Sequence, residues 1–326
     1  MSNENATLLS APLTDGLALN DALEARCADL DRAIGRLSLL PAHDALTLLK
    51  YSFSAPKIIH TLRCTPCLGH ETLHKFDDFL KTGLGNITNL SISDIQWVQA
   101  SLPVNIGGLG IRRVASLALP AFLASAAVIH ILQSLLLHKS HHLPDLHRDN
   151  LLSTWLTTFN SSAQAFSSDG KQSALDKPVI AADVAAVKSH FGGSFNTARL
   201  LVVSAPHSGD WLHALPLATC SLKLENEAIR IAVGLRLGIN LREPHQCPCS
   251  KLVDARGSHG LSCKRGTARA IHHHQLSDIV RRALVRANIP SVLEPSGLSR
   301  GDGKRPDGMT LIPWQGEKMS PGRHCH

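Results

Sequence analysis

Three cysteines and one histidine near residue 250 have the types and the spacing of a metal site. Cys247 and Cys249 flank a single proline, and His259 and Cys263 follow within the next 14 residues. Thiolates and a neutral imidazole are the donors of a tetrahedral structural zinc site, in which the metal replaces a small hydrophobic core. The sequence therefore predicts one structural zinc ion held by Cys247, Cys249, His259 and Cys263.

The spacing leaves the identity of the ligands open. One residue between the first two cysteines is fewer than the two to four usual in zinc motifs, so His245 or one of His272–His274 is an alternative ligand. Cysteines that share a loop by chance are the alternative to a metal site. Cys64 and Cys67 have the usual two-residue spacing, but no second ligand pair lies near them, which favours a role in a core or turn.

Two carboxylates near the C-terminus have the context of a divalent-metal site in a nuclease. Glu294 follows the apolar segment 289–293, and Asp307 precedes another at 309–312. Acidic side chains beside short strands can bind Mg²⁺, which activates water against a phosphodiester. Such a site needs a further carboxylate and a lysine, which the later sequence does not provide at the expected spacing. Glu294 and Asp307 are therefore interpreted as an incomplete catalytic site, with a turn at 306–307 as the alternative.

Basic side chains cluster in the same part of the chain. The 326 residues include 33 Lys and Arg and 26 Asp and Glu, a net charge of +7, and residues 223–305 alone hold 15 basic and 7 acidic residues. Clustered positive charge favours a polyanion, because neutralised phosphates release counterions; a solvated basic face is the alternative. We expect contacts to RNA or DNA from Lys264, Arg265, Arg269, Arg281, Arg282, Arg286, Lys304 and Arg305.

Apolar residues at helical spacing predict a mainly α fold that positions these groups. Helices are expected over 15–39, 41–57, 68–84, 93–101, 181–191, 194–203, 224–237 and 267–288. Pro56 should kink or stop the second of these, and Arg230 and Arg236 should be exposed. The last helix should turn inward Leu276, Ile279, Val280 and Leu284.

Three further segments limit the interpretation. Residues 115–137 are long enough to cross a bilayer, but Pro120 and several polar residues interrupt them, so we expect a buried core helix and no membrane partner. Glycines at 107, 108 and 110 predict a turn, since their spacing is not that of a dinucleotide site. Eight cysteines without a secretory leader indicate a reducing, intracellular compartment.

The order of these motifs resembles the region after the palm in non-LTR retrotransposon reverse transcriptases of the class with a Cys/His knuckle and a C-terminal restriction-like endonuclease. The similarity is carried by Ala55–Lys57, Leu62–Arg63, Phe76–Asp77, Ser93–Pro103, Gly107–Arg112, Ala121–Ser125, the knuckle cysteines with His259–Cys263, and Lys304–Gly308. It covers about residues 15–318, and 138–205 is its least diagnostic part.

The resemblance implies a helical thumb and linker bundle that grips template and primer, followed by a small zinc knuckle and a truncated α/β nuclease-like segment. It divides the chain into a thumb-like region (1–140), a linker (141–222), the basic knuckle with its helix (223–288) and the start of the endonuclease (289–326). It also implies a nuclear location, with RNA or DNA as partner. No small-molecule substrate is indicated.

Two departures from the family predict a chain with neither activity complete. The polymerase holds two Mg²⁺ ions with paired aspartates in a hairpin, whereas Asp77 and Asp78 lie in an amphipathic helical segment. After Trp314, a Pro/Gly/His/Cys tail replaces the third acidic strand. We therefore expect an inactive retroelement fragment, truncated or frame-disrupted, that keeps affinity for nucleic acid, with Mg²⁺ relevant only to a complete nuclease site. The alternatives are a non-enzymatic zinc-dependent nucleic-acid adaptor and an all-helical scaffold without zinc.

Overall fold

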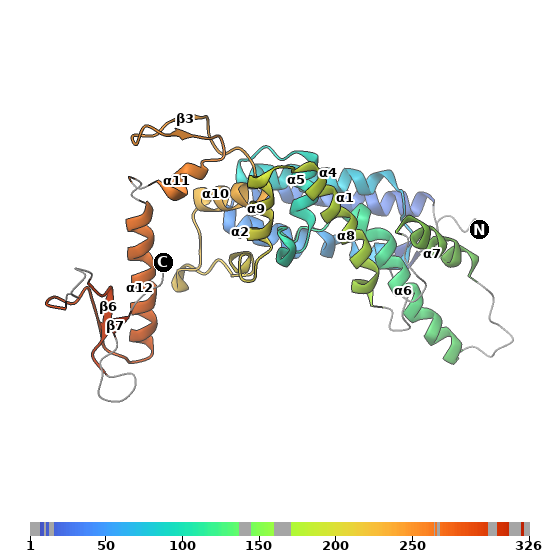
Figure 1. Ribbon diagram of the computed structural model, residues 1–326. Coiled ribbons are helices and arrows are strands. Elements are labelled where there is room, and N and C mark those ends of the chain that lie inside the picture. Colours follow the sequence, from blue (N-terminus) through green and yellow to red (C-terminus); the bar gives the residue numbers. More distant parts are fainter. Residues whose placement is uncertain are drawn as a thin grey trace. The chain divides into compact units, whose positions relative to one another are not determined.

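The computed structural model describes residues 7–9, 11–12, 16–136, 145–159, 171–263, 265, 268–298, 305–312 and 321–322. Over these residues the chain is mainly α-helical, as the sequence predicts (Figure 1). It divides into two units, which we call the helical unit (residues 1–241) and the basic unit (residues 242–326).

The helical unit contains most of the helices. They are α1 (Leu17–Leu37), α2 (Ala42–Leu48), α3 (Ala55–Cys64), α4 (Glu71–Thr88), α5 (Asp94–Ser101), α6 (Val114–Leu136), α7 (Leu146–Thr158), α8 (Gln172–His190), α9 (Ser194–Val203) and α10 (Asn226–Leu237). Shorter elements are a π-helical turn at Leu49–Phe53, 3-10 turns at Val104–Ile106, Asp210–Leu212 and Ala218–Cys220, and the strands β1 (Thr7–Leu8) and β2 (Ala11–Pro12), which pair antiparallel.

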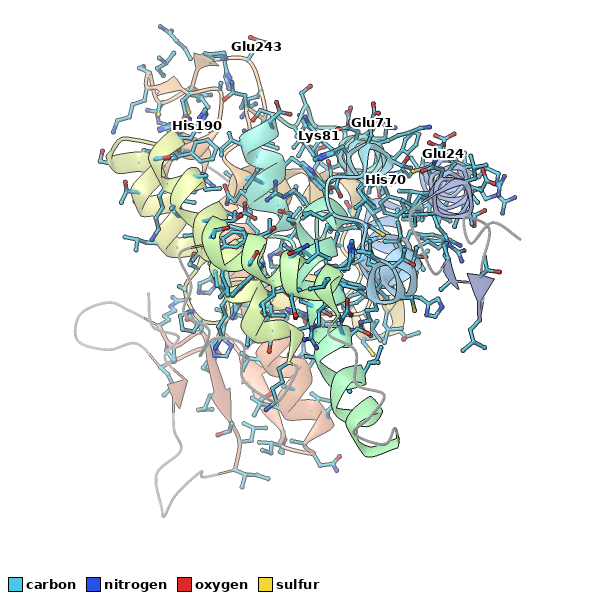
Figure 2. The ribbon with its side chains drawn as sticks, turned by 90° about the vertical axis from the view of Figure 1, so that its right-hand side faces the viewer. Glu24, His70, Glu71, Lys81, His190 and Glu243 are labelled. Atoms are coloured by element: carbon cyan, nitrogen blue, oxygen red, sulfur yellow. The ribbon has the colours of Figure 1, made fainter. Side chains whose placement is uncertain are left out.

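The main core forms where α1 packs along α4 and α3 packs along α6. Apolar residues three and four apart give α1 one buried stripe, which includes Leu23 and Leu30, and Phe76 of α4 is fully buried against it. Polar links hold the edge of this contact. Glu24 of α1 accepts a hydrogen bond from Lys75 at 2.9 Å and lies beside His70, whose ring caps α4 (Figure 2).

A buried carboxylate of α4 caps the first turn of α6. Asp77 accepts hydrogen bonds from the backbone N–H groups of Val114 and Ala115, at 2.7 and 3.2 Å. These groups have no acceptor within their own helix, so Asp77 satisfies donors that the fold would otherwise bury unpaired. Burial raises the pKa of Asp77 to about 7, against the lowering effect of the two amide donors. The residue therefore fixes where α6 begins.

Residues 115–136 of the predicted apolar segment lie in α6, residue 137 lies outside the described residues, and the prediction of a buried core helix is confirmed for the first half of α6. Leu117, Ala121 and Leu123 are buried, whereas Val128 and Ile129 are nearly half exposed. In the described part of the chain, no helix combines the length and apolar character needed to span a bilayer.

Arg236 is buried, so the prediction that it is exposed is wrong. It donates hydrogen bonds to the carbonyls of Val104, Gly108 and Ser208, at 2.6, 2.9 and 3.2 Å. Val104 and Gly108 belong to the glycine-rich turn, and Ser208 belongs to a second turn before Asp210–Leu212. A Cβ at Gly108 would lie 2.0 Å from the carbonyl oxygen of Leu102. The guanidinium therefore clamps the turn from inside, while Arg230 remains partly exposed beside Glu227.

The helix expected over 41–57 is divided. A π-helical turn follows α2, Ser54 ends it, and α3 begins at Ala55. Pro56 lies in the first turn of α3, where its missing N–H costs nothing and its fixed φ favours the helix. The break expected near Pro56 thus falls at Ser54, two residues before it, and the proline lies in the first turn of the next helix.

The basic unit contains α11 (Ser258–Ser262) and α12 (Ala268–Arg286) with two small sheets. β3 (His245–Gln246) pairs antiparallel with β4 (Leu252–Val253), and the sheet of β5 (Ser291–Leu293), β6 (Gly308–Thr310) and β7 (Pro321–Gly322) is also antiparallel. Residues 223–241, which the sequence analysis grouped with the knuckle, lie in the helical unit instead, because Ile229, Val233 and Leu237 of α10 join the main core.

The buried face of α12 differs from the predicted one. Leu276 and Ile279 are about half exposed, at 48% and 56%, so their predicted inward orientation is wrong. Ser277 is buried, and Val280 and Leu284 are partly buried. Spacings of three and four residues place these three side chains in one stripe, which Leu276 and Ile279 flank.

Candidate metal centre and basic surface

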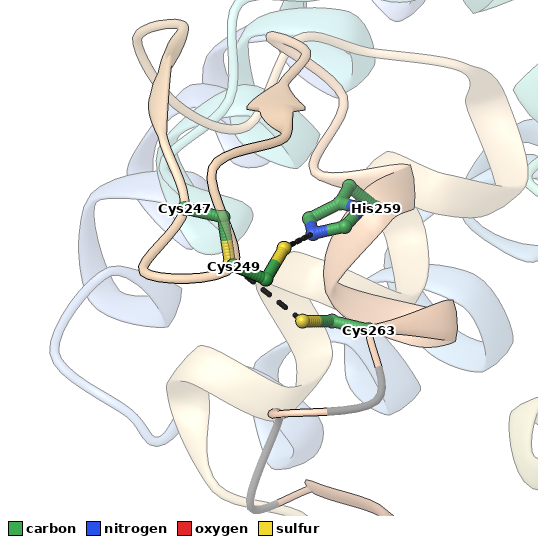
Figure 3. A group of neighbouring side chains, drawn as sticks. All are labelled: Cys247, Cys249, His259 and Cys263. Carbon is green, nitrogen blue, oxygen red and sulfur yellow. Dashed lines mark hydrogen bonds between the residues drawn. The ribbon is translucent and has the colours of Figure 1, made fainter.

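Two short elements bring the four predicted metal ligands together. The β3–β4 hairpin carries Cys247 and Cys249 in its turn, which the bonds from Cys247 N–H to Lys251 O and from Ser250 N–H to Cys247 O close at 2.9 and 2.8 Å. His259 lies on α11, and Cys263 follows its last residue. The hairpin and the helix thus approach each other with their ligands facing inward (Figure 3).

The donor atoms are close enough to share one ion. One ligand atom from each of Cys247, Cys249, His259 and Cys263 lies within 4.8 Å of the others. The Sγ atoms of Cys247 and Cys263 are 3.6 Å apart, and Cys249 Sγ is 3.1 Å from His259 Nε2. Tetrahedral zinc with normal bond lengths places two sulfurs about 3.8 Å apart and a sulfur and a nitrogen about 3.6 Å apart. These two separations fit such a site to within about 0.5 Å, and all the others are within 4.8 Å.

The electrostatics of the cluster favour metal binding. Hydrogen bonds lower the pKa of Cys249 to about 6, against the raising effect of burial; the bond from the backbone of Lys251 has the largest effect, and those with Cys247, Cys263 and His259 add to it. A backbone hydrogen bond from Cys249 lowers the pKa of Cys247, but the neighbouring thiols and burial raise it overall. The Cys249 thiol therefore ionises readily. A divalent cation would stabilise the negative charge on the other two cysteines when they lose their protons, and thiolates are the species that bind zinc.

Two side chains outside the cluster support its elements. The carboxylate of Asp254 accepts from both the N–H and the hydroxyl of Ser258 at 2.9 Å, which anchors the start of α11. Arg265, predicted to contact nucleic acid, donates to the carbonyl of Pro248 at 2.8 Å. This bond links the chain just after Cys263 to the turn that holds the first two cysteines. Sequence reasoning missed both contacts, because neither residue belongs to a recognisable motif.

Among the alternative histidine ligands, the side chain of His272 lies outside the described residues, and the other three do not belong to the cluster. His245 contacts the carbonyl of Glu243, and His273 and His274 pack ring edge against ring face on α12. The four residues first predicted as ligands, Cys247, Cys249, His259 and Cys263, all belong to the cluster. The exposed Cys64 contacts His60 and the buried Cys67 contacts Thr65, in agreement with a core or turn role for that pair.

Glu294 and Asp307 are neighbours without forming a carboxylate pair around a metal. They meet at the end of the β5–β6 ladder, where Glu294 N–H donates to Asp307 O at 3.0 Å. The Asp307 carboxylate is instead 2.9 Å from His273 Nε2 of α12, a partner that the sequence analysis did not foresee. Among the described side chains, neither carboxylate belongs to a group of three or more possible metal ligands.

The predicted nucleic-acid contacts are partly described. Lys264 and Lys304 lie outside the described residues, as does the side chain of Arg269 on α12. Arg305 is exposed. Arg281, Arg282 and Arg286 line a groove of about 300 Å³ on α12 with Asp278 and Val285.

The sequence matches none of the protein-family models and none of the curated proteins with which it was compared.

Proposed function

We propose that the basic unit is a nucleic-acid-binding module whose fold depends on one structural zinc ion. The observation that carries the proposal is the four-donor cluster in a unit that holds the entire net charge. Residues 242–326 contain 14 Lys and Arg and 7 Asp and Glu, whereas residues 1–241 contain 19 of each. A neutral helical unit and a basic unit of net +7 indicate that a polyanion binds the second.

Zinc would supply what the small unit lacks in hydrophobic core. Val253 and Cys263 are its main buried apolar residues among those described, and its strands have two or three residues each. Sheets this small are marginal in water without a further crosslink. Zinc bound by Cys247, Cys249, His259 and Cys263 would join the hairpin to α11 and thereby fix the chain that leads into α12.

The resemblance to retroelement reverse transcriptases extends the proposal to the whole chain. Under this reading the helical unit corresponds to the thumb and linker, and the protein is a retroelement fragment that binds RNA or DNA. We further propose that it neither extends a primer nor cleaves a plasmid with Mg²⁺. Robust Mg²⁺-dependent nicking that Asp307→Ala abolishes would overturn this part of the proposal.

The test combines metal analysis with a binding measurement. Wild-type protein should contain one zinc per chain and bind labelled nucleic acid with an affinity that falls as salt rises. Cys249→Ser with Cys263→Ser should lose the zinc and most of the binding. Cys64→Ser with Cys220→Ser, which removes two exposed thiols of the helical unit, is the matched control and should change neither. Unchanged zinc content in the first double variant would exclude this metal site.

A further inference from the structure

The groove on α12 places arginines where a phosphate backbone could reach them. Arg282 and Arg286 are one turn apart, about 6 Å along the helix axis, and Arg281 lies next to Arg282. Within the described residues, the guanidinium groups of Arg281 and Arg286 have no ion-pair or hydrogen-bond partner. Asp278 pairs with Arg282 at 3.0 Å and leaves the groove with an excess of positive charge. The groove is thus open to an anion along its length.

The composition of the basic unit argues against a site for single strands. Residues 242–326 contain no Phe or Tyr and one Trp, Trp314, which lies outside the described residues. Sites for single-stranded nucleic acid stack exposed bases on aromatic side chains, at about 1–3 kcal/mol per base. The α12 groove offers guanidinium groups and the side of Val285 instead. It can therefore contact phosphates but offers no large aromatic ring to an unpaired base.

We infer that the basic unit binds double-stranded nucleic acid through its phosphate backbone, along the groove of Arg281, Arg282 and Arg286. The inference rests on the proposed function and adds the form of the ligand. A duplex carries one negative charge per about 1.7 Å of axis, twice the density of one of its strands. Recognition by charge alone therefore favours duplexes and is independent of base sequence.

The test measures the anisotropy of four labelled probes with zinc-loaded full-length protein: a 20-base-pair DNA duplex, an RNA duplex of the same sequence, and one single strand of each. Both duplexes should bind at least tenfold more tightly than either strand, and scrambling the sequence should change the affinity less than threefold. Comparing the DNA duplex with the RNA duplex shows whether the basic unit binds the phosphate backbone of both kinds of double helix. Single strands bound as tightly as duplexes would overturn the inference.

Variants of α12 test the groove itself. Each phosphate contact contributes about 0.9 to the slope of log affinity against log salt, so at 0.1 M salt the loss of two contacts should weaken duplex binding about 60-fold and the loss of three about 500-fold. Arg281→Ala, Arg282→Ala and Arg286→Ala in one chain should show this loss. The same positions changed to Lys should stay within about threefold of wild type, because charge alone is required. Loss in the Lys variant equal to that in the Ala variant would contradict this mode of binding.

A control separates charge from position. Changing Arg26, Arg32 and Arg36 of α1 to Ala removes the same charge from the helical unit and should leave the affinity within threefold. Circular dichroism and zinc content show whether each variant is folded. If no probe binds the wild type even at low salt, the proposed function fails. If duplexes and strands bind alike, only the inference fails.

Discussion

Replacing Arg236 with Leu should destabilise the helical unit by about 3 kcal/mol. Its guanidinium donates to the buried carbonyls of Val104 and Gly108 and to the partly buried carbonyl of Ser208. Val104 O keeps a second donor, the N–H of Gly107 at 3.1 Å, so two carbonyls lose their partner. Each buried acceptor left unsatisfied costs about 1–3 kcal/mol.

Two further contributions have opposite signs. The shorter side chain of Leu leaves empty space beside the glycine turn, which adds to the loss. Removing a buried cation offsets part of the lost stability, because the charged guanidinium is poorly solvated in the folded protein. Burial accordingly lowers the pKa of Arg236 to about 10. The balance is the net value of about 3 kcal/mol, and Arg236→Lys, which cannot reach several acceptors at once, should lose about half as much.

Urea unfolding followed by tryptophan fluorescence measures this change. Three of the four tryptophans, Trp97, Trp155 and Trp211, belong to the helical unit and report its unfolding. The midpoint should fall with little change in slope. Arg36→Ala, at an exposed position of α1, is the control and should stay within about 0.5 kcal/mol. A loss below about 1 kcal/mol for Arg236→Leu would refute the clamp.

Two other predictions concern the helical unit. Because burial raises the pKa of Asp77 to about 7, the folded state retains a proton between pH 4 and 7 that the unfolded state loses. The free energy of unfolding should therefore fall as pH rises through this range, by at most about 4 kcal/mol, and Asp77→Asn should flatten the profile; equal slopes would contradict the assignment. Gly108→Ala should cost about 3 kcal/mol or more, since its Cβ would meet the Leu102 carbonyl at 2.0 Å, whereas Gly35→Ala on α1, with open space around it, should stabilise by about 0.5–1 kcal/mol. In thermal melts, the melting temperature should fall for Gly108→Ala and rise for Gly35→Ala. An unchanged melting temperature for Gly108→Ala would contradict the geometry.

Periodicity predicted α1 and α4 well because these helices depend on local side-chain spacing, and Leu23 and Leu30 lie in the buried stripe of α1. No helix was predicted where α7 and the first half of α8 lie. The helix boundary at Ser54 was harder to predict from the sequence, since whether Pro56 ends one helix or starts the next depends on how the flanking turns pack. The burial of Arg236 could not be predicted from the sequence, because the carbonyls that accept its hydrogen bonds lie in turns about 30 and 130 residues away in the sequence.

In the candidate site, too, a grouping of residues that lie near one another in the sequence was predicted, whereas a contact between residues far apart in the sequence was not. The grouping of Cys247, Cys249, His259 and Cys263 was predicted from residue type and spacing, and these four lie together in the structure as a group that could hold a metal ion. The pairing of His273 with Asp307 joins residues 34 apart and had no sequence signal. The face of α12 was misjudged because burial beside β5 follows from tertiary contact, and the polar Ser277 takes a place that hydrophobicity assigned to Leu276.

The central claim is that a metal ion organises the basic unit so that it binds nucleic acid. The most direct measurement is a titration of zinc into the metal-free full-length chain, followed through the anisotropy of a labelled DNA duplex at constant salt. Binding should appear with one equivalent of zinc and should not appear in Cys249→Ser with Cys263→Ser. Duplex binding that is equally tight before and after zinc is added would contradict the account.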